Sequence, residues 1–181
     1  AVAGFDALAH ALESHVTRSR NPWSQAFARE AWRLLVGAYP KLLDGELDLG
    51  VWSDMLLGSH LAGAAIETSM LGAGHALANP LSVLYNTTHG VAVALVLPSV
   101  VRLNLPVVGD LYAELMGEAD LAAFLEGLRE RAGLPSSLAD AGIADADLDG
   151  LTHLASEQWT LQHNPQPLSK AQIRQVYEGL S

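Results

Sequence analysis

The chain has 181 residues, of which 50% are hydrophobic and 17% charged, and 10 Lys+Arg against 20 Asp+Glu give a formal net charge of −10. This composition can fill one buried core, which excludes wholesale disorder, and the acidic balance argues against nucleic acid or an anionic membrane as a partner. The lack of cysteine excludes disulfides, thiolate catalysis and cysteine-bound metal clusters, so any metal must be held by His, Asp or Glu.

The first seventy residues show helical spacing throughout. One face of a first helix carries four apolar residues, Phe5, Leu8, Leu12 and Val16. Asn21 and Pro22 supply an N-cap and a first-turn proline for a second helix, which is expected to end near Pro40. The segment 52–70 is hydrophobic on most sides, and this predicts a long central helix.

The middle of the chain predicts two shorter helices. Gly72 and Gly74 interrupt the preceding helix, and helical stretches follow at 75–85 and from 89 to about 97. The polar residues at 86–88 have turn chemistry and separate these two stretches.

The sequence of the last third of the chain predicts three small helices with clear start and stop signals. They are a helix after Asp120 that ends at Gly133, one capped by Asp145 or Asp147 that ends near Trp159, and one opened by a capping box at 169–172 that ends at Leu180. Strand signals are scarce, and no repeat or long linker divides the chain. One all-α domain over residues 1–181 is therefore predicted.

No membrane or targeting segment is predicted. The longest apolar run, 91–101, is interrupted by Pro98 and is shorter than the roughly 18 residues that a bilayer span needs. The chain begins Ala-Val-Ala-Gly, without Met or a basic leader, and enters a helical motif at once. We expect a cytoplasmic protein and, from this abrupt start, a piece of a longer chain.

Asp6 and His10 form a first candidate pair of metal ligands. Four residues apart on a helix, their Cβ atoms lie about 5–6 Å apart on one face, which suits two ligands of one cation. With 20 acidic residues and 7 His in the chain, about one such pair is expected by chance. A surface ion pair is therefore the alternative.

His75 and His89 lie in the least polar part of the chain, where a single histidine is usually a hydrogen-bonded core residue. On a straight helix, positions 14 apart would be separated by about 21 Å, so the two can meet only if the chain bends. Pro80 and the turn at 86–88 allow a bend. Close backbone approach beside each histidine is allowed by Gly72, Gly74 and Gly90. One carboxylate and three imidazoles suit Fe(II) or Zn(II) better than Ca²⁺ or Mg²⁺.

Three segments stand out by their order and spacing, namely GFDALAHALE at 4–13, GHALANPL at 74–81 and YNTTHGVA at 85–92. Together they resemble the metal-binding half of the iron-containing (group III) alcohol dehydrogenases. The closing NPQPLS at 164–169 also resembles the C-terminus of that family. The similarity covers essentially the whole chain, which is therefore identified as a member of this family.

The resemblance implies a two-domain, dehydroquinate synthase-like fold. In that fold an N-terminal α/β domain binds NAD(P), and a C-terminal helical, bundle-like domain holds the metal. It implies that residues 1–181 are the second domain only, and the chain has no Gly-rich phosphate-binding turn between a strand and a helix. By the family pattern, the metal ligands are Asp6, His10, His75 and His89.

The implied activity is that of a metal-dependent oxidoreductase acting on a small alcohol or its aldehyde. The divalent metal polarises the substrate oxygen for hydride exchange with NAD(P). Because the nucleotide-binding domain is expected to be missing, the 181-residue chain is predicted to bind metal without turnover. The same absence would leave an apolar face exposed, and the family resemblance implies a homo-oligomer.

One position departs from the family pattern. Many members carry a further histidine four residues after the third ligand, where this chain has Asn79. Asparagine cannot titrate, but it can still donate a hydrogen bond to substrate or to a ligand. The substitution removes a titratable group from the expected proton route.

Other polar and aromatic residues are assigned ordinary roles. Glu13 is a possible partner for the ring N–H of His10. His60 is predicted to lie in the core, His153 on a helix surface, and His163 in a structural loop. The four tryptophans are expected to belong to the core, namely Trp23, Trp32, Trp52 and Trp159.

Three alternative functions stay open from the sequence. The chain could be the zinc-binding domain of a glycerol dehydrogenase-like or dehydroquinate synthase-like enzyme, although the Asp-x-x-x-His pair and the NTTHG segment favour the alcohol dehydrogenase branch. It could be a non-catalytic helical module whose histidines satisfy core polar groups. It could also be a helical protein-interaction domain, which an exposed apolar face without metal would favour.

Overall fold

The computed structural model describes residues 1–117 and 119–181, and within them it contains helices and no β-strand. The α-helices are α1 (Val2–Val16), α2 (Pro22–Leu43), α3 (Leu49–Glu67), α4 (Ala73–Tyr85), α5 (His89–Met116), α6 (Leu121–Arg131), α7 (Leu148–Ser156) and α8 (Lys170–Glu178), and a 3₁₀ helix, η1 (Trp159–His163), follows α7. The prediction of an all-α fold is confirmed.

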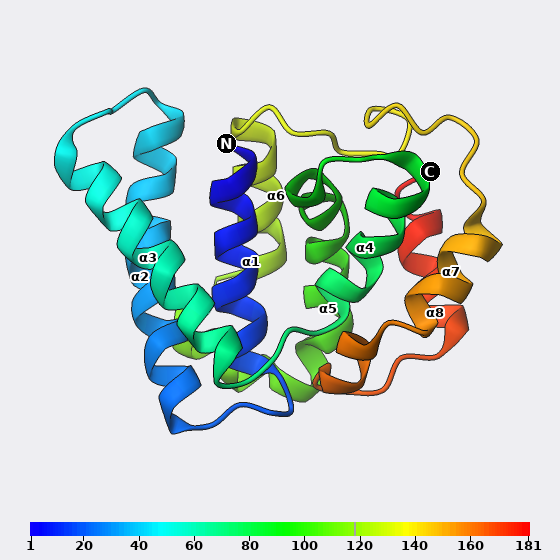
Figure 1. Cartoon of the computed structure of the whole chain (residues 1–181), viewed down its shortest axis with the longest axis horizontal. Helices are drawn as coiled ribbons and strands as arrows, with labels where there is room; N and C mark the ends of the chain where they lie inside the picture. Colours follow the sequence, from blue (N-terminus) through cyan, green and yellow to red (C-terminus); the bar gives the residue numbers. More distant parts are fainter. Residues whose placement is uncertain (118) are drawn as a thin grey trace.

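The first helix lies at the centre of the molecule. Figure 1 shows α2 and α3 side by side at one end, α7 and α8 at the other, and α1 between α3 and the α4–α5 pair. Every residue of α1 from Gly4 to Val16 is buried except Asp6 and His10. From Gly4 to Val16 the helix therefore opens to solvent only at the two positions that the sequence proposes as metal ligands.

The predicted helix caps are largely confirmed. The side chain of Asn21 accepts hydrogen bonds from the backbone N–H groups of Trp23 and Ser24 at the start of α2. Asp147, and not Asp145, caps α7. The Ser169 capping box opens α8 as predicted. Each of these contacts is local in sequence, which is why the pattern alone could identify it.

The prediction that the segment around α3 forms a central helix is wrong. α3 lies at the edge of the molecule against α1 and α2, and the side chains of Leu49 and Leu56 are 82% and 68% exposed. His60 is also exposed and does not lie in the core as predicted. An apolar composition does not decide which face of a helix packs. The helix α3 packs against α2, and at Gly58 an added Cβ atom would lie 2.8 Å from Cγ of Leu35.

The tryptophan prediction holds for one residue of four. Trp32 is buried in the core, whereas Trp23, Trp52 and Trp159 are exposed. Trp23 stands in the first turn of α2 and Trp52 in the first turn of α3, where a helix has fewer neighbours than at its middle.

Prolines do not end the helices where the sequence suggested. α2 continues through Pro40 to Leu43, and α5 continues through Pro98 and Pro106 to Met116 instead of ending near Leu97. The helical dihedrals of α5 fail only at Val108 (φ −130°, ψ 24°), which follows the second proline and marks a kink. By length and composition α5 could cross a membrane, but 61% of its most apolar stretch is buried among the other helices.

Gly90 lets the start of α5 lie directly against the start of α1. A Cβ atom at position 90 would stand 2.7 Å from the carbonyl oxygen of Val2. We expect Gly90→Ala to lower the free energy of unfolding by about 1–3 kcal/mol, because the backbone of α1 or of α5 has to shift to make room for the methyl group. Gly63→Ala is the control, since a Cβ there meets nothing within 4 Å, and it should stabilise α3 by up to about 1 kcal/mol. Urea unfolding measures both, and equal effects would contradict the prediction.

Candidate metal centre

Three helices bring the four candidate ligands together. Asp6 and His10 lie one turn apart on α1, His75 lies in the first turn of α4, and His89 is the first residue of α5. Between α4 and α5 the chain reverses at Asn86, which adopts the left-handed conformation (φ 53°). This is the bend that the sequence required for the histidines of α4 and α5 to meet.

Asp6 is the common neighbour of the three imidazoles. Its Oδ1 lies 3.5 Å from Nε2 of His75 and 3.7 Å from Nε2 of His89, and its Oδ2 lies 3.8 Å from Nε2 of His10. Two atoms that each bind one ion at about 2.1 Å can lie at most about 4.2 Å apart. All three distances are compatible with one shared ion.

The imidazole rings are packed against each other in the same cluster. The rings of His10 and His75 are stacked with their centroids 4.7 Å apart, and the centroids of His75 and His89 are 5.3 Å apart. One donor atom each from Asp6, His10 and His75 lies within 4.8 Å of the others. His89 is attached to this group through its contact with Asp6.

Two buried atoms in the cluster fit a bound cation. Oδ1 of Asp6 and Nε2 of His75 are both inaccessible to solvent, and neither has a hydrogen-bond partner among the described residues. Buried polar atoms in folded proteins nearly always have partners, because each unpaired atom costs about 1–3 kcal/mol. A divalent ion held by these donors would satisfy both atoms.

The charges in the cluster shift its pKa values in opposite directions. Burial alone would lower the pKa of His75, but the carboxylates of Asp6 and Glu13 on either side of the ring raise it to about 9. Burial alone would raise the pKa of Asp6, but the surrounding imidazoles bring it below its usual value. The pKa values of His10 and His89 are lowered, mainly by burial.

Glu13 contacts His75 and not His10, so the partner suggested by the sequence is wrong. Its Oε2 lies 2.6 Å from Nδ1 of His75, and its Oε1 accepts a hydrogen bond of 2.7 Å from the backbone N–H of Gly74. Spacing along α1 placed Glu13 near His10, but the side chain turns towards the neighbouring helix α4. Sequence periodicity within one helix cannot reveal such a contact.

Asn79 lies one turn after His75 on α4. Its amide nitrogen donates a 2.9 Å hydrogen bond to Oε1 of Gln158, just before η1. The asparagine therefore links α4 to the segment that follows α7. Its hydrogen bond goes to this neighbour and not to a candidate ligand.

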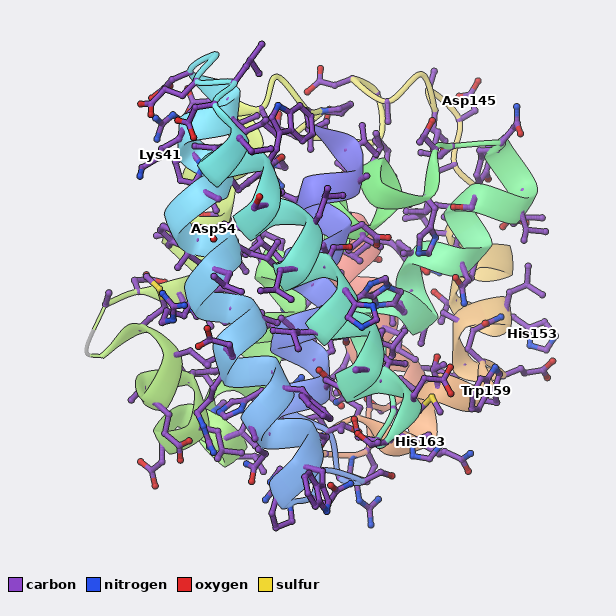
Figure 2. The ribbon with its side chains drawn as sticks, turned by 60° about the vertical axis from the view of Figure 1, so that its left-hand side comes forward. Lys41, Asp54, Asp145, His153, Trp159 and His163 are labelled. Carbon is purple, nitrogen blue, oxygen red and sulfur yellow. The ribbon has the colours of Figure 1, made fainter. Side chains whose placement is uncertain are left out.

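Two other histidines have the roles expected from the sequence. His153 is exposed, projects from α7 (Figure 2) and lies 3.7 Å from Glu157. Nδ1 of His163 lies 2.7 Å from the hydroxyl of Ser19, and its carbonyl oxygen accepts a hydrogen bond from the hydroxyl of Thr17. His163 thus joins η1 to the turn after α1, which is a structural contact.

His15 is a buried histidine that the sequence did not single out. It is fully buried on α1, and its Nε2 lies 3.5 Å from a carboxylate oxygen of Glu114 on α5. Burial lowers the pKa of His15; the charge of Glu114 opposes this shift, and the charges of Arg29 and Arg20 reinforce it.

This lowered pKa predicts a loss of stability in mild acid. The unfolded chain takes up a proton on His15 near pH 6.5, whereas the folded chain does so only at lower pH. Stability should therefore fall below about pH 7, by up to about 1.4 kcal/mol per pH unit for this group. His15→Gln should flatten the curve of unfolding free energy against pH between 7 and 5, with His153→Gln as the control for losing a histidine. Parallel curves for wild type and His15→Gln would contradict the prediction.

Comparison with known sequences gives matches along the full chain. The sequence profile described as Fe-containing alcohol dehydrogenase family, C-terminal, matches residues 1–180. Lactaldehyde reductase from Escherichia coli (strain K12) is 32% identical over 191 positions, which cover 98% of this chain and 50% of that enzyme. For 1,3-propanediol dehydrogenase from Citrobacter freundii, identity is also 32%, with 98% of this chain and 49% of that enzyme covered. The chain spans about half the length of these curated relatives.

Solved structures give the same result. The crystal structure of a 1,3-propanediol oxidoreductase matches with a TM-score of 0.92 and 31% identity, over 100% of this chain and 51% of that chain. An iron-containing alcohol dehydrogenase from Thermotoga maritima matches with a TM-score of 0.81 and 27% identity, over 98% of this chain and 48% of that chain. The arrangement of the helices is therefore shared with these structures.

Proposed function

Since the chain belongs to the iron-containing alcohol dehydrogenase family, and matches the C-terminal part of it, we propose that it forms the metal-binding part of an NAD(P)-dependent alcohol dehydrogenase. The observation that carries this proposal is the convergence of Asp6 with three imidazoles from different helices. The relatives are named for lactaldehyde and 1,3-propanediol. Their names support a small alcohol or aldehyde as the substrate.

The ligands in this proposal are Asp6, His10, His75 and His89, and the ion is Fe(II) or Zn(II). The mixed set of one oxygen and three nitrogen donors supports this choice, as do the unpaired buried atoms of Asp6 and His75. When bound, the ion would polarise the oxygen of the alcohol or aldehyde. Asp6 supplies the only negative charge among the four ligands and partly compensates the charge of the ion.

The exposure of the ligands indicates from which side a substrate can approach. The side chain of His75 is 4% exposed, whereas those of His10 and His89 are 26% and 41% exposed. The substrate oxygen is therefore proposed to reach the centre past His10 and His89. Because their pKa values are lowered, these two rings are neutral and can coordinate at neutral pH.

Asn79 is proposed to orient the substrate. Its amide nitrogen is engaged with Gln158, and this fixes the side chain while its carbonyl oxygen can still accept a hydrogen bond. A second hydroxyl group on a small diol or hydroxyaldehyde could donate to that oxygen. Asn79 cannot relay a proton, so any proton route uses other groups.

The hydride acceptor is proposed to bind to a part of the enzyme outside residues 1–181. The relatives are about twice as long as this chain, and NAD(P) is proposed to occupy an N-terminal α/β domain. A homo-oligomer and a cytoplasmic location stay predictions. In this proposal, the 181-residue chain binds metal but shows no turnover without its partner domain.

Metal binding is tested on the purified chain. The protein is loaded anaerobically with Fe(II) or Zn(II), and crystals are measured at both absorption edges. We expect one ion per chain, in contact with all four proposed ligands. His153→Ala, which removes a surface histidine, should bind the same amount. A chain that binds no ion at this place would favour the non-catalytic helical module instead.

Activity is tested in a chimera. Residues 1–181 replace the corresponding half of Escherichia coli lactaldehyde reductase, and the reduction of small aldehydes is followed through the consumption of NADH. We expect turnover that requires metal and is lost in the chimera with Asp6→Ala. Turnover by the 181-residue chain alone with NAD(P) would contradict the assignment of the hydride acceptor to another domain.

A further inference from the structure

We propose that Glu13 is a positioning residue for the metal centre, which fixes the ring of His75 so that Nε2 faces Asp6 and holds the start of α4 against α1. This inference rests on the proposed function, because it assigns a task towards the metal. It concerns a residue that lies outside the ligand set.

The first step is the contact between Glu13 and the imidazole ring. Oε2 of Glu13 lies 2.6 Å from Nδ1 of His75, and both side chains are buried. Both oxygens of this carboxylate also face backbone N–H groups, Oε1 that of Gly74 and Oε2 that of His75, so the carboxylate acts as a hydrogen-bond acceptor on each of these sides. The 2.6 Å contact is therefore assigned as an N–H that Nδ1 of His75 donates, and Nε2 is left to face Oδ1 of Asp6 at 3.5 Å.

The second step is the capping of α4. The N-cap residue of this helix is Gly72, which has no side chain to accept from the free N–H groups of the first turn. Glu13 takes this place through Oε1, which accepts from Gly74, and through Oε2, which accepts a 3.2 Å bond from the backbone of His75. Oδ1 of Asn164 accepts a further bond, from the N–H of Ala73. The carboxylate on α1 thus fixes both the ring of His75 and the backbone that carries it.

The third step is the space that glycine provides for the carboxylate. A Cβ atom at Gly74 would lie 2.9 Å from Oε1 of Glu13 and 3.0 Å from its Cδ, and one at Gly72 would lie 3.1 Å from Oε1. Cβ atoms in proteins hardly ever come closer than 3.0 Å to another residue, and contacts of 3.0–3.4 Å are tighter than most. These two glycines therefore leave room for the side chain of Glu13 at the start of α4.

The fourth step connects the two ligands on α1 with the ligand on α4. Glu13 lies on the same helix as Asp6 and His10, and its contacts reach the helix that carries His75. One side chain therefore sets the position of the third ligand relative to the first two. Groups that orient metal-binding histidines in this way typically change metal affinity about 10–100-fold when they are removed.

The test compares Glu13→Gln with Glu114→Gln. Glu114 is the matched control, because its carboxylate also approaches a buried histidine on α1, namely His15, away from the metal centre. Zn(II) affinity is measured by competition with a chelator, and the protonation of the His75 ring is read from long-range ¹H–¹⁵N correlation spectra of the zinc-loaded protein. Glu13→Gln should lower the affinity about 10–100-fold and disturb the single Nδ1–H form of His75. Glu114→Gln should change neither.

The outcomes separate this inference from the proposed function. Wild type that binds no Zn(II) would overturn the proposed function and this inference with it. If the wild type binds Zn(II), and Glu13→Gln binds it with equal affinity and shows an unchanged His75 signal, the inference about Glu13 is wrong and the proposed function stands. If Glu13→Gln does not fold, Gly74→Ala displaces the same carboxylate without removing it, and unchanged affinity in that variant would be decisive against the inference. Zn(II) on Nδ1 of His75 in wild type would also overturn it.

Discussion

Asp6→Ala is expected to abolish tight metal binding. Its carboxylate lies within 3.8 Å of a ring nitrogen of all three histidines, and no other acidic side chain approaches more than one of them in the described part of the chain. Its removal leaves three imidazoles without the anion that holds them around one ion. The loss should exceed the effect of an orienting group, so we expect at least about a 100-fold drop in affinity, or about 2.7 kcal/mol.

Chelator competition and elemental analysis measure this loss. Glu157→Ala is the matched control, because Glu157 and His153 form a carboxylate–imidazole pair at the same spacing on the protein surface. His89→Ala should also weaken binding strongly, since His89 approaches the same oxygen of Asp6 as His75 does. Wild-type affinity in Asp6→Ala would show that the ligand set is wrong.

Glu13→Ala is expected to destabilise the metal-free protein more than any other substitution considered for this chain. It removes the acceptor of three buried N–H groups, namely Nδ1 of His75 and the backbone nitrogens of Gly74 and His75. Breaking a buried pair of this kind costs about 3–5 kcal/mol, which is a large part of the roughly 5–15 kcal/mol that stabilises a typical domain.

Urea unfolding at pH 7 with a chelator present measures this effect without any contribution from bound metal. Glu114→Ala is the control, because the carboxylate of Glu114 is 45% exposed and an exposed ion pair contributes up to about 1 kcal/mol. Equal destabilisation by the two substitutions would mean that the buried contacts of Glu13 contribute no more to the free energy of unfolding than an exposed ion pair does.

The helix α1 contributes both to the core and to the proposed metal centre. Most residues of α1 are buried, and the helix packs against α2, α3 and α5. Asp6 and His10 are its only partly exposed residues between Gly4 and Val16. Asp6 and His10 therefore stand on a helix that is packed on most sides, while both residues stay partly open to solvent.

Local features of this protein could be predicted from the sequence. The helices, the caps at Asn21 and Ser169, and the pairing of Asp6 with His10 depend on residues within about one turn of each other, whose geometry is the same in every helix. The glycines beside His75 and His89 were also predicted to allow close approach, and both Gly74 and Gly90 lie against neighbouring chain segments.

The contacts between helices were decided by the tertiary structure alone. It made α1 the central helix and left α3 at the edge, carried α5 past Pro98, and turned Glu13 towards His75 and Asn79 towards Gln158. Spacing along one helix sets the direction of a side chain but not the helix that it meets. That partner depends on how all the helices together bury their apolar surface, which the periodicity of a single segment does not determine.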